Sequence, residues 1–313
     1  MKINPDEDIL ATDFIIKSER AVTKSDDYGR VPQLESDGYF DPEFIRPTTP
    51  VVKKYILTNV FGSSTSRFDI TNPSGTTFRY TWDGTGTDPV ISLTTVPVGT
   101  ALYINGQNFN AANKGAFVTT AAGANYFEIT NAAGVAENDK TLGTGAINYC
   151  WIKQPGLKYV EVETQDAGNG GYDSSSHAGS VGGASSFGAY VTNAVGDILI
   201  PGGRGATGLN NGSNPISGHG GNSMYGFGGK GSRTGNGGDG NGYGSGGGGG
   251  TDTSANSGGD GGDAGPYAKK ILAASAVTDS VVIIIGIGGV GATAGNDGGK
   301  GADGAVFIKE TYI

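Results

Sequence analysis

Short runs that alternate apolar and polar residues follow one another between residues 50 and 150. They are rich in Val, Ile, Thr, Tyr and Phe, and turn sequences such as TNPSGT, DGTGTDP and NAANKG separate them. Such runs predict β-strands, and their spacing is typical of a sandwich or barrel. No stretch has a helical apolar period. The predicted strands cover residues 51–60, 77–82, 90–96, 101–106, 115–120 and 125–131.

The chain after residue 150 has predicted strands at its two ends and a glycine-rich stretch between them. A strand is predicted over Tyr159–Thr164, and VVIIIGIGGV and GAVFIKETYI predict two more near the end. Of the 59 glycines, 46 lie between Gly156 and Gly304. This break in composition divides the chain into an N-terminal arm (1–48), a β-sandwich-like module (49–150) and a glycine-rich C-terminal domain (151–313).

The glycines between residues 202 and 265 favour every third position. In steps of three from residue 202, 14 of 22 positions are Gly, whereas the other two phases hold 6 of 21 and 8 of 21. A flexible linker has no reason to keep this register, but a polyproline-II-type helix has three residues per turn. A row of Gly would let such helices bond backbone to backbone, so we predict ordered polyglycine-II-type segments. The alternative is a disordered linker, which the high entropy of Gly favours.

The arm has isolated apolar residues, four prolines in VPQLESDGYFDPEFIRPTTP and an SDG turn signal. Alone it cannot bury enough surface to offset the entropy of ordering. It is either a disordered tail or an extended arm that orders against another chain. In the second case the docking residues would be Val31, Pro32, Leu34, Phe40 and Phe44.

The net charge of −9 and the lack of a basic run disfavour binding to nucleic acid or to anionic membranes. The longest aliphatic run, Val281–Ile285, is too short to span a bilayer, so no membrane insertion is expected. MKINPDEDIL lacks the features of a signal peptide, which predicts synthesis in a cytoplasm without export by a visible signal. The single Cys150 excludes an intramolecular disulfide.

Two glycine motifs suggest ligands. GIGGVG at 286–291 matches a dinucleotide fingerprint, but the following ATAGNDGGKGADGA cannot form the required helix. GGDGGD at 258–263 and GGKGAD at 298–303 match the start of a calcium nonapeptide, yet they are not in tandem. Asp239, Asp260 and Asp263 either hold an ion in another geometry or solubilise the surface. We expect no cofactor and no metal.

Catalytic residues are not predicted. His177 and His219 have no zinc spacing, and the chain has no nucleophile elbow or Walker lysine. Asp166, Asp173 and Asp197 are carboxylates of the kind that polysaccharide depolymerases pair in a cleft, but nothing in the sequence pairs them. We therefore expect loop polar residues and a protein that is not an enzyme.

Aromatic residues set among glycines are the candidate binding residues. A glycine field has too few side chains to bury them all, and exposed aromatics offer contact area at low entropic cost. They would contact a receptor or, equally, cap the ends of the glycine lattice. Nearby Asn residues would bond a glycan or form turns. The candidates are Tyr172, His177, Asn210, Asn211, His219, Tyr225, Phe227 and Tyr243.

Several stretches resemble proteins of tailed phages. YGRVPQLESDGYFDPEFI is similar to a G-(K/R)-V-P-x-L-x-x-x-G-x-(L/F)-(D/N)-P segment of tail fibres and other virion proteins. TFRYTWDGTGTDP and GANYFEITNAAGVAE resemble a β-module of virion proteins. WIKQPGLKYVEVE and GADGAVFIKETYI frame a region similar to the glycine-rich C-terminal domain of tail fibres and adhesins.

The resemblance implies a virion location and a receptor-binding function. Fibre proteins of this kind are usually homotrimers, and their adhesins contact a glycan or an outer-membrane protein of the host. The arm would dock on other tail or baseplate proteins. One alternative is a purely structural virion component, such as a baseplate, collar or capsid decoration protein. A second alternative is a polysaccharide-degrading tailspike.

Overall fold

The protein is all-β in its computed structural model, which describes residues 52–57, 65–86, 98–143, 146–174, 177–209, 215–252 and 257–312. Two short 3₁₀ helices, η1 (Ala111–Asn113) and η2 (Ala274–Ala276), are the only helices in these ranges. None is long and apolar enough to cross a membrane in the described part of the chain. The five arm residues predicted to dock lie outside the described residues, as do Asn210 and Asn211.

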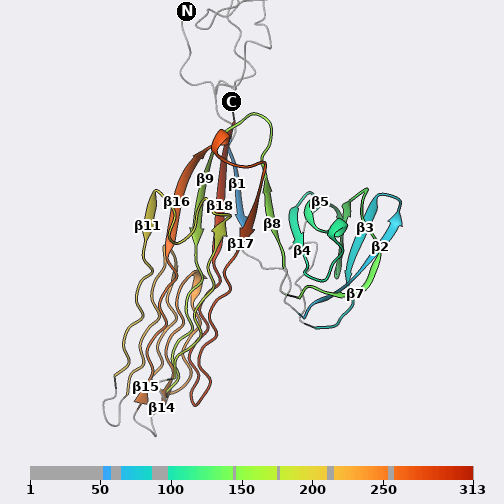
Figure 1. Ribbon diagram of the computed structural model, residues 1–313. Helices are drawn as coiled ribbons and strands as arrows, with labels where there is room; N and C mark the ends of the chain where they lie inside the picture. Colours follow the sequence, from blue (N-terminus) through green and yellow to red (C-terminus); the bar gives the residue numbers. More distant parts are fainter. Residues whose placement is uncertain are drawn as a thin grey trace, which may run out of the picture. The chain divides into compact units, whose positions relative to one another are not determined.

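The first large sheet has five antiparallel strands in the order β1-β18-β9-β16-β11 (Figure 1). Alternate residues of its strands are buried, among them Val160, Val162 and Ile308, because one face packs on the hydrophobic core. The strands are β1 (Val52–Leu57), β18 (Ala305–Tyr312), β9 (Leu157–Gln165), β16 (Tyr267–Ala273) and β11 (Ile198–Ile200).

The second sheet has nine strands in the order β10-β17-β8-β4-β5-β6-β3-β2-β7. Its core includes a stacked pair, Tyr80 and Phe127, with ring centroids 5.0 Å apart. The strands are β2 (Arg67–Ser74), β3 (Thr77–Trp82), β4 (Ala101–Asn105), β5 (Gly115–Ala122), β6 (Tyr126–Thr130), β7 (Glu137–Thr141), β8 (Ala146–Ile152), β10 (Ser186–Phe187) and β17 (Ser280–Ile284).

The two sheets meet through a buried contact between β8 and β18. Trp151 Nε1 donates a hydrogen bond of 2.6 Å to the carboxylate of Glu310, and the Trp151 ring packs edge-on against Phe187 at 5.5 Å. The predicted all-β class is confirmed. β8 crosses the predicted boundary at residue 150, and β1 pairs with β18, so the division into domains stays a prediction.

The glycine field forms extended segments, here called rods, that continue the strands of the sheets (Figure 1). β9 runs into rod 166–174, whose successive N–H groups donate to three neighbouring rods in rotation. The order repeats after every third residue, with N···O distances of 2.8 to 3.0 Å. The bonds are Ala167 to Gly183, Gly168 to Ala302, Asn169 to Asp263, Gly170 to Ser180, Gly171 to Gly299 and Tyr172 to Asp260. This rotation is the three-residue turn of polyglycine II.

Rod 245–251 lies at the centre of the bundle, and all of its residues are buried. Its N–H groups donate to rods 215–222, 166–174 and 235–240, while its carbonyls accept from rods 226–232, 257–266 and 296–304. A Cβ atom added to any glycine from 246 to 250 would overlap a carbonyl oxygen of a neighbouring rod. Five consecutive glycines are therefore needed where a rod is surrounded on all sides.

Asp and Asn side chains replace carbonyls along the surface of the bundle. Each accepts a backbone N–H from the adjacent rod at 2.6 to 3.0 Å, and both partners recur every third residue. The pairs are Asp260 with Gly208, Asp263 with Gly205, Asn236 with Asp297, Asp239 with Lys300, Asp166 with Ser185 and Asn169 with Gly182. Asp239, Asp260 and Asp263 thus have a structural role. The sequence had suggested only that they bind an ion or solubilise the surface.

Candidate functional site

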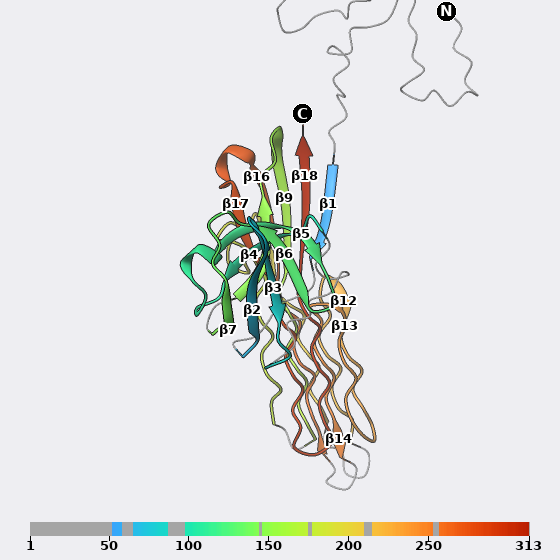
Figure 2. The ribbon, with the colours of Figure 1, turned by 90° about the vertical axis from the view of Figure 1, so that its right-hand side faces the viewer.

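An aromatic hairpin projects from the glycine region. It consists of β12 (Tyr225–Phe227) and β13 (Asn241–Tyr243), in which Tyr225 pairs with Tyr243 across the two strands. The hairpin is labelled beneath β1 in Figure 2. A second hairpin, of β14 (Thr251–Asp252) and β15 (Ser257–Gly258), follows the central rod. The first hairpin brings together three predicted binding residues: Tyr225, Phe227 and Tyr243.

Two tyrosines fasten the hairpin to the five-stranded sheet. The Tyr225 ring lies 4.4 Å from that of Phe307 and 6.0 Å from that of Tyr267, while Tyr243 packs edge-on against Phe307 at 5.8 Å. The Tyr225 hydroxyl donates to Glu163. Burial, and then this bond to Glu163, raise the pKa of Tyr225 well above its usual value. Burial also raises the pKa of Tyr267 to about 12, so both hydroxyls stay protonated.

Phe227 is directed to solvent, with 74% of its surface exposed. Met224, next to Tyr225 in the chain, is also exposed. Single exposed hydrophobic residues are ordinary, but this one sits on a hairpin whose other aromatics are held in place. The arrangement presents a rigid apolar contact, which binding surfaces use because few rotamers must be ordered.

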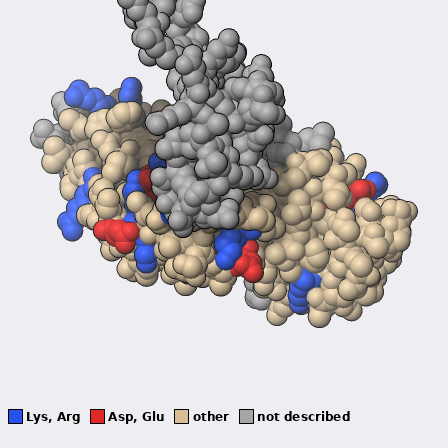
Figure 3. Space-filling view, turned by 90° about the horizontal axis from the view of Figure 1, so that it is seen from above, with Lys and Arg blue, Asp and Glu red and all other residues tan. Residues whose placement is uncertain are grey.

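Opposite charges alternate on the sheet surface beside the hairpin. Lys269 bonds to Glu163 at 3.0 Å and also to Glu161, and Lys309 lies 3.3 Å from Glu161. The hydrogen bond from Lys269 is the main reason that the pKa of Glu161 is lowered. In the view of Figure 3, basic and acidic residues are scattered over a mostly uncharged surface. The sheet surface beside the hairpin therefore offers paired charges.

The remaining predicted residues do not join the hairpin. Tyr172 is a half-buried rod residue, and His219 Nδ1 accepts the N–H of Gly231 at 3.2 Å. The exposed His177 ring lies 3.0 Å from the buried carboxylate of Asp173. Among the described residues, none of the hydrogen bonds or ring contacts of the hairpin involves Tyr172, His177 or His219.

The three carboxylates considered for catalysis each accept a backbone N–H. Asp166 accepts from Ser185, Asp173 from His177 and Ala294, and Asp197 from Ile271. These bonds give each carboxylate a structural role as an acceptor, and Asp166 and Asp173 are buried. No group of three or more His, Cys, Asp or Glu side chains able to hold a metal occurs in the described ranges.

Sequence reasoning missed the residues that anchor the hairpin. Phe307 and Glu163 occupy facing positions on β18 and β9, and Tyr267 lies two residues before Lys269, which faces Glu163 from the other side. The alternation along each strand shows that these residues share a face, but no pattern within a single strand identifies its neighbours.

Comparisons with protein-family models, curated proteins and solved structures found no match.

Proposed function

We propose that the protein is a virion protein of a tailed phage, a tail fibre or tip adhesin, that binds a receptor on the host surface. The observation that carries the proposal is the aromatic hairpin, which exposes Phe227 from a base of packed rings beside a backbone-bonded lattice. A lattice of this kind needs few side chains inside, which leaves surface positions and loops open to variation. The similarity to phage adhesins supports the same conclusion.

The proposal includes assembly as a homotrimer and docking of the N-terminal arm on other tail or baseplate proteins. Several copies held together multiply weak contacts, because the second contact forms at a high effective concentration. In this account the protein is not an enzyme, and its receptor is a glycan or an outer-membrane protein.

Cell binding by the full-length protein tests the proposal. Fluorescently labelled protein is titrated onto a panel of bacterial strains, and we expect saturable binding to the host strain that competes with phage adsorption. Phe227→Ala should weaken binding about tenfold, the loss typical of an exposed aromatic anchor. Tyr159→Ala is the control, because Tyr159 is also an exposed aromatic residue but lies on β9 and not on the hairpin.

Two results would contradict the proposal. If correctly folded protein binds none of the strains to which the phage adsorbs, the result would favour the alternative of a purely structural virion component. Release of reducing sugar from host polysaccharide would favour the tailspike alternative.

A further inference from the structure

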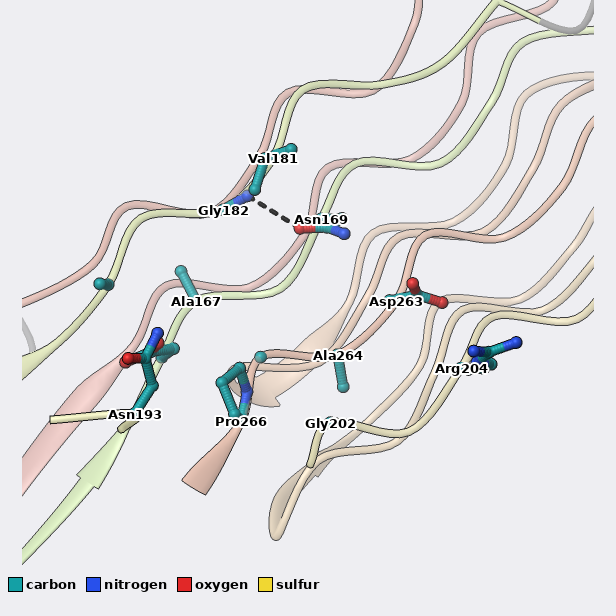
Figure 4. Close-up of a pocket in the computed structure, with 13 residues that line it drawn as sticks. Ala167, Asn169, Val181, Gly182, Asn193, Gly202, Arg204, Asp263, Ala264 and Pro266 are labelled. Carbon is teal, nitrogen blue, oxygen red and sulfur yellow. Dashed lines mark hydrogen bonds between the residues drawn. The ribbon is translucent and has the colours of Figure 1, made fainter. Parts of the chain in front are cut away.

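A groove runs along one side of rod 166–174. On that side, no hydrogen bond joins this rod to another rod of the described chain. This rod donates to rods 177–185, 257–266 and 296–304 and accepts from rods 245–251 and 286–292 within the described chain. The groove has a volume of about 350 Å³ and is open to solvent. Its walls come from rods 177–185 and 201–209, and its floor from rods 166–174 and 257–266 (Figure 4).

The groove is not an empty position for another rod. At most glycine positions of the rods, an added Cβ would overlap the backbone of the neighbouring rod. Side chains line the groove instead, among them Asp166, Asn169, Val181, Ala184 and Arg204. A rod could not approach this wall to backbone hydrogen-bonding distance, so an occupant must be recognised by side chains.

Hydrogen-bond acceptors occupy the floor. Asp166, 4% exposed, accepts the N–H of Ser185 at 2.7 Å and a bond from the Asn193 side chain. Burial raises the pKa of Asp166 above its usual value. Asp263 uses Oδ1 for the N–H of Gly205, at 2.8 Å, which leaves its second oxygen for another donor.

Donors lie close to these acceptors. Asn169 Oδ1 accepts the N–H of Gly182, and its amide nitrogen points away from that bond into the groove (Figure 4). Arg204, on rod 201–209, also lines the groove (Figure 4). Arg204 belongs to none of the ion pairs found between described residues. The carboxylates and the amide, held by backbone N–H bonds, together with the guanidinium, can both donate to and accept from a ligand rich in hydroxyls.

We propose that this groove binds an oligosaccharide, whose hydroxyl groups donate to Asp263 and accept from Asn169 and Arg204. Val181 and Pro266 supply the apolar contacts that a sugar ring needs. The volume lies at the lower end of the roughly 300–1,000 Å³ of ligand pockets, which suits a short saccharide. The inference rests on the proposed function for the source of the glycan, since a cell-surface receptor can be one, but it names a site separate from the aromatic hairpin.

An oligosaccharide array is the direct test. Full-length protein is applied to an array of neutral, amino-sugar and uronic-acid oligosaccharides that also carries an extended proline-rich peptide, and the best binder is then titrated by calorimetry. We expect one family of related saccharides to bind. Arg204→Ala should weaken that binding at least tenfold, since bonds to a charged group are lost. Ala184→Phe should do the same by filling the groove.

Arg233→Ala is the matched control, because Arg233 is an exposed arginine of the glycine region that does not line the groove. Thermal unfolding checks that each variant is folded. Binding to no saccharide, binding only to the peptide, or binding that neither groove variant weakens would each overturn the inference.

The same variants separate this inference from the proposed function. Cell binding that depends on Phe227 while the array stays empty would overturn the groove site alone. Groove-dependent saccharide binding without binding to any host strain would overturn the adhesin proposal and leave the groove site standing.

Discussion

The strands of residues 65–143 and the rod bundle bury their backbones by opposite means. In the first region, large side chains such as Phe68, Tyr80 and Phe127 fill the interior, and the backbone bonds within a sheet. In the second, rod 245–251 has almost no side chains, and its backbone bonds outwards to six neighbours. Removing the side chain allows two backbones to meet directly, so hydrogen bonding replaces hydrophobic packing as the main cohesive contact.

The two regions also need different kinds of residue at their closely packed positions. A large apolar residue is needed where side chains meet, and its loss leaves a cavity. Glycine is needed where rods meet, and the gain of a single methyl group produces a collision. The two regions should therefore fail under opposite substitutions.

The largest effect is expected from Gly247→Ala. The new Cβ would overlap the carbonyl oxygen of Gly299, and neither backbone can move without breaking bonds to other rods. We expect a loss of at least about 4 kcal/mol in unfolding free energy, measured by chemical denaturation. Gly235→Ala is the control, because only Ser232 Oγ lies near its Cβ position, at 4.0 Å. Equal stability of the two variants would refute the close-packed lattice.

Phe127→Ala should come next. Phe127 is fully buried against Tyr80, and truncation of a buried Phe typically costs about 3–5 kcal/mol. Hydrogen exchange in the rods should stay unchanged, because their bonds do not pass through this side chain. Val118→Ala, at an exposed position of β5, serves as the control. If exchange in the rods rose together with that of β3 and β6, the two regions would share one unfolding unit.

A smaller effect is expected from Asp260→Ala. The change removes the acceptor for the N–H of Gly208, now 2.6 Å from Asp260 Oδ1, and an unpaired N–H costs about 1–3 kcal/mol. Asp260→Asn keeps a carbonyl oxygen at this place and should lose much less. Chemical denaturation of the wild type, Asp260→Ala and Asp260→Asn measures the three unfolding free energies. Equal losses for the Ala and Asn variants would show that the charge of Asp260, and not its acceptor oxygen, is needed.

The smallest effect concerns pH and Asp166. Its folded pKa is raised, mainly by burial, so protonation of this carboxyl is easier in the folded than in the unfolded protein. The resulting stability is full below the ordinary carboxyl pKa and is lost as pH rises through the folded value. Asp166→Asn cannot ionise, so the wild type should lose stability relative to this variant between acid and neutral pH. A difference between the two that does not change with pH would show that Asp166 is not shifted.

The sequence allowed several strands and the three-residue register of the rods to be predicted, but not β8, β16 or the neighbours of each rod. The strand at 77–82 follows from its composition, and the every-third-residue register of Gly follows from the pitch of the rods. β2 and β7 were missed because polar residues dominate RFDITNPS and ENDKT, whose strand state is set by pairing with one another. A glycine has no side chain that could distinguish one neighbouring rod from another, so the glycine rows do not specify which rods meet.

Three of the eight predicted binding residues lie on the hairpin, whereas the residues that support the hairpin were missed. Tyr225, Phe227 and Tyr243 stand out as aromatics among glycines, and the hairpin brings them together. Their support from Phe307 and Glu163 depends on strand order, which no single stretch of the chain encodes. The groove lies between rods that are far apart in sequence, so no local motif could have indicated it.

Hydrogen exchange at residues 246–251 tests the central claim most directly, because their N–H groups all bond to other rods. The lattice predicts protection comparable to that of β9 in the same protein, measured by mass spectrometry of overlapping peptides or by NMR. Exchange at the rate of an unstructured peptide throughout 246–251 would show that the glycine field is a linker and would contradict the account.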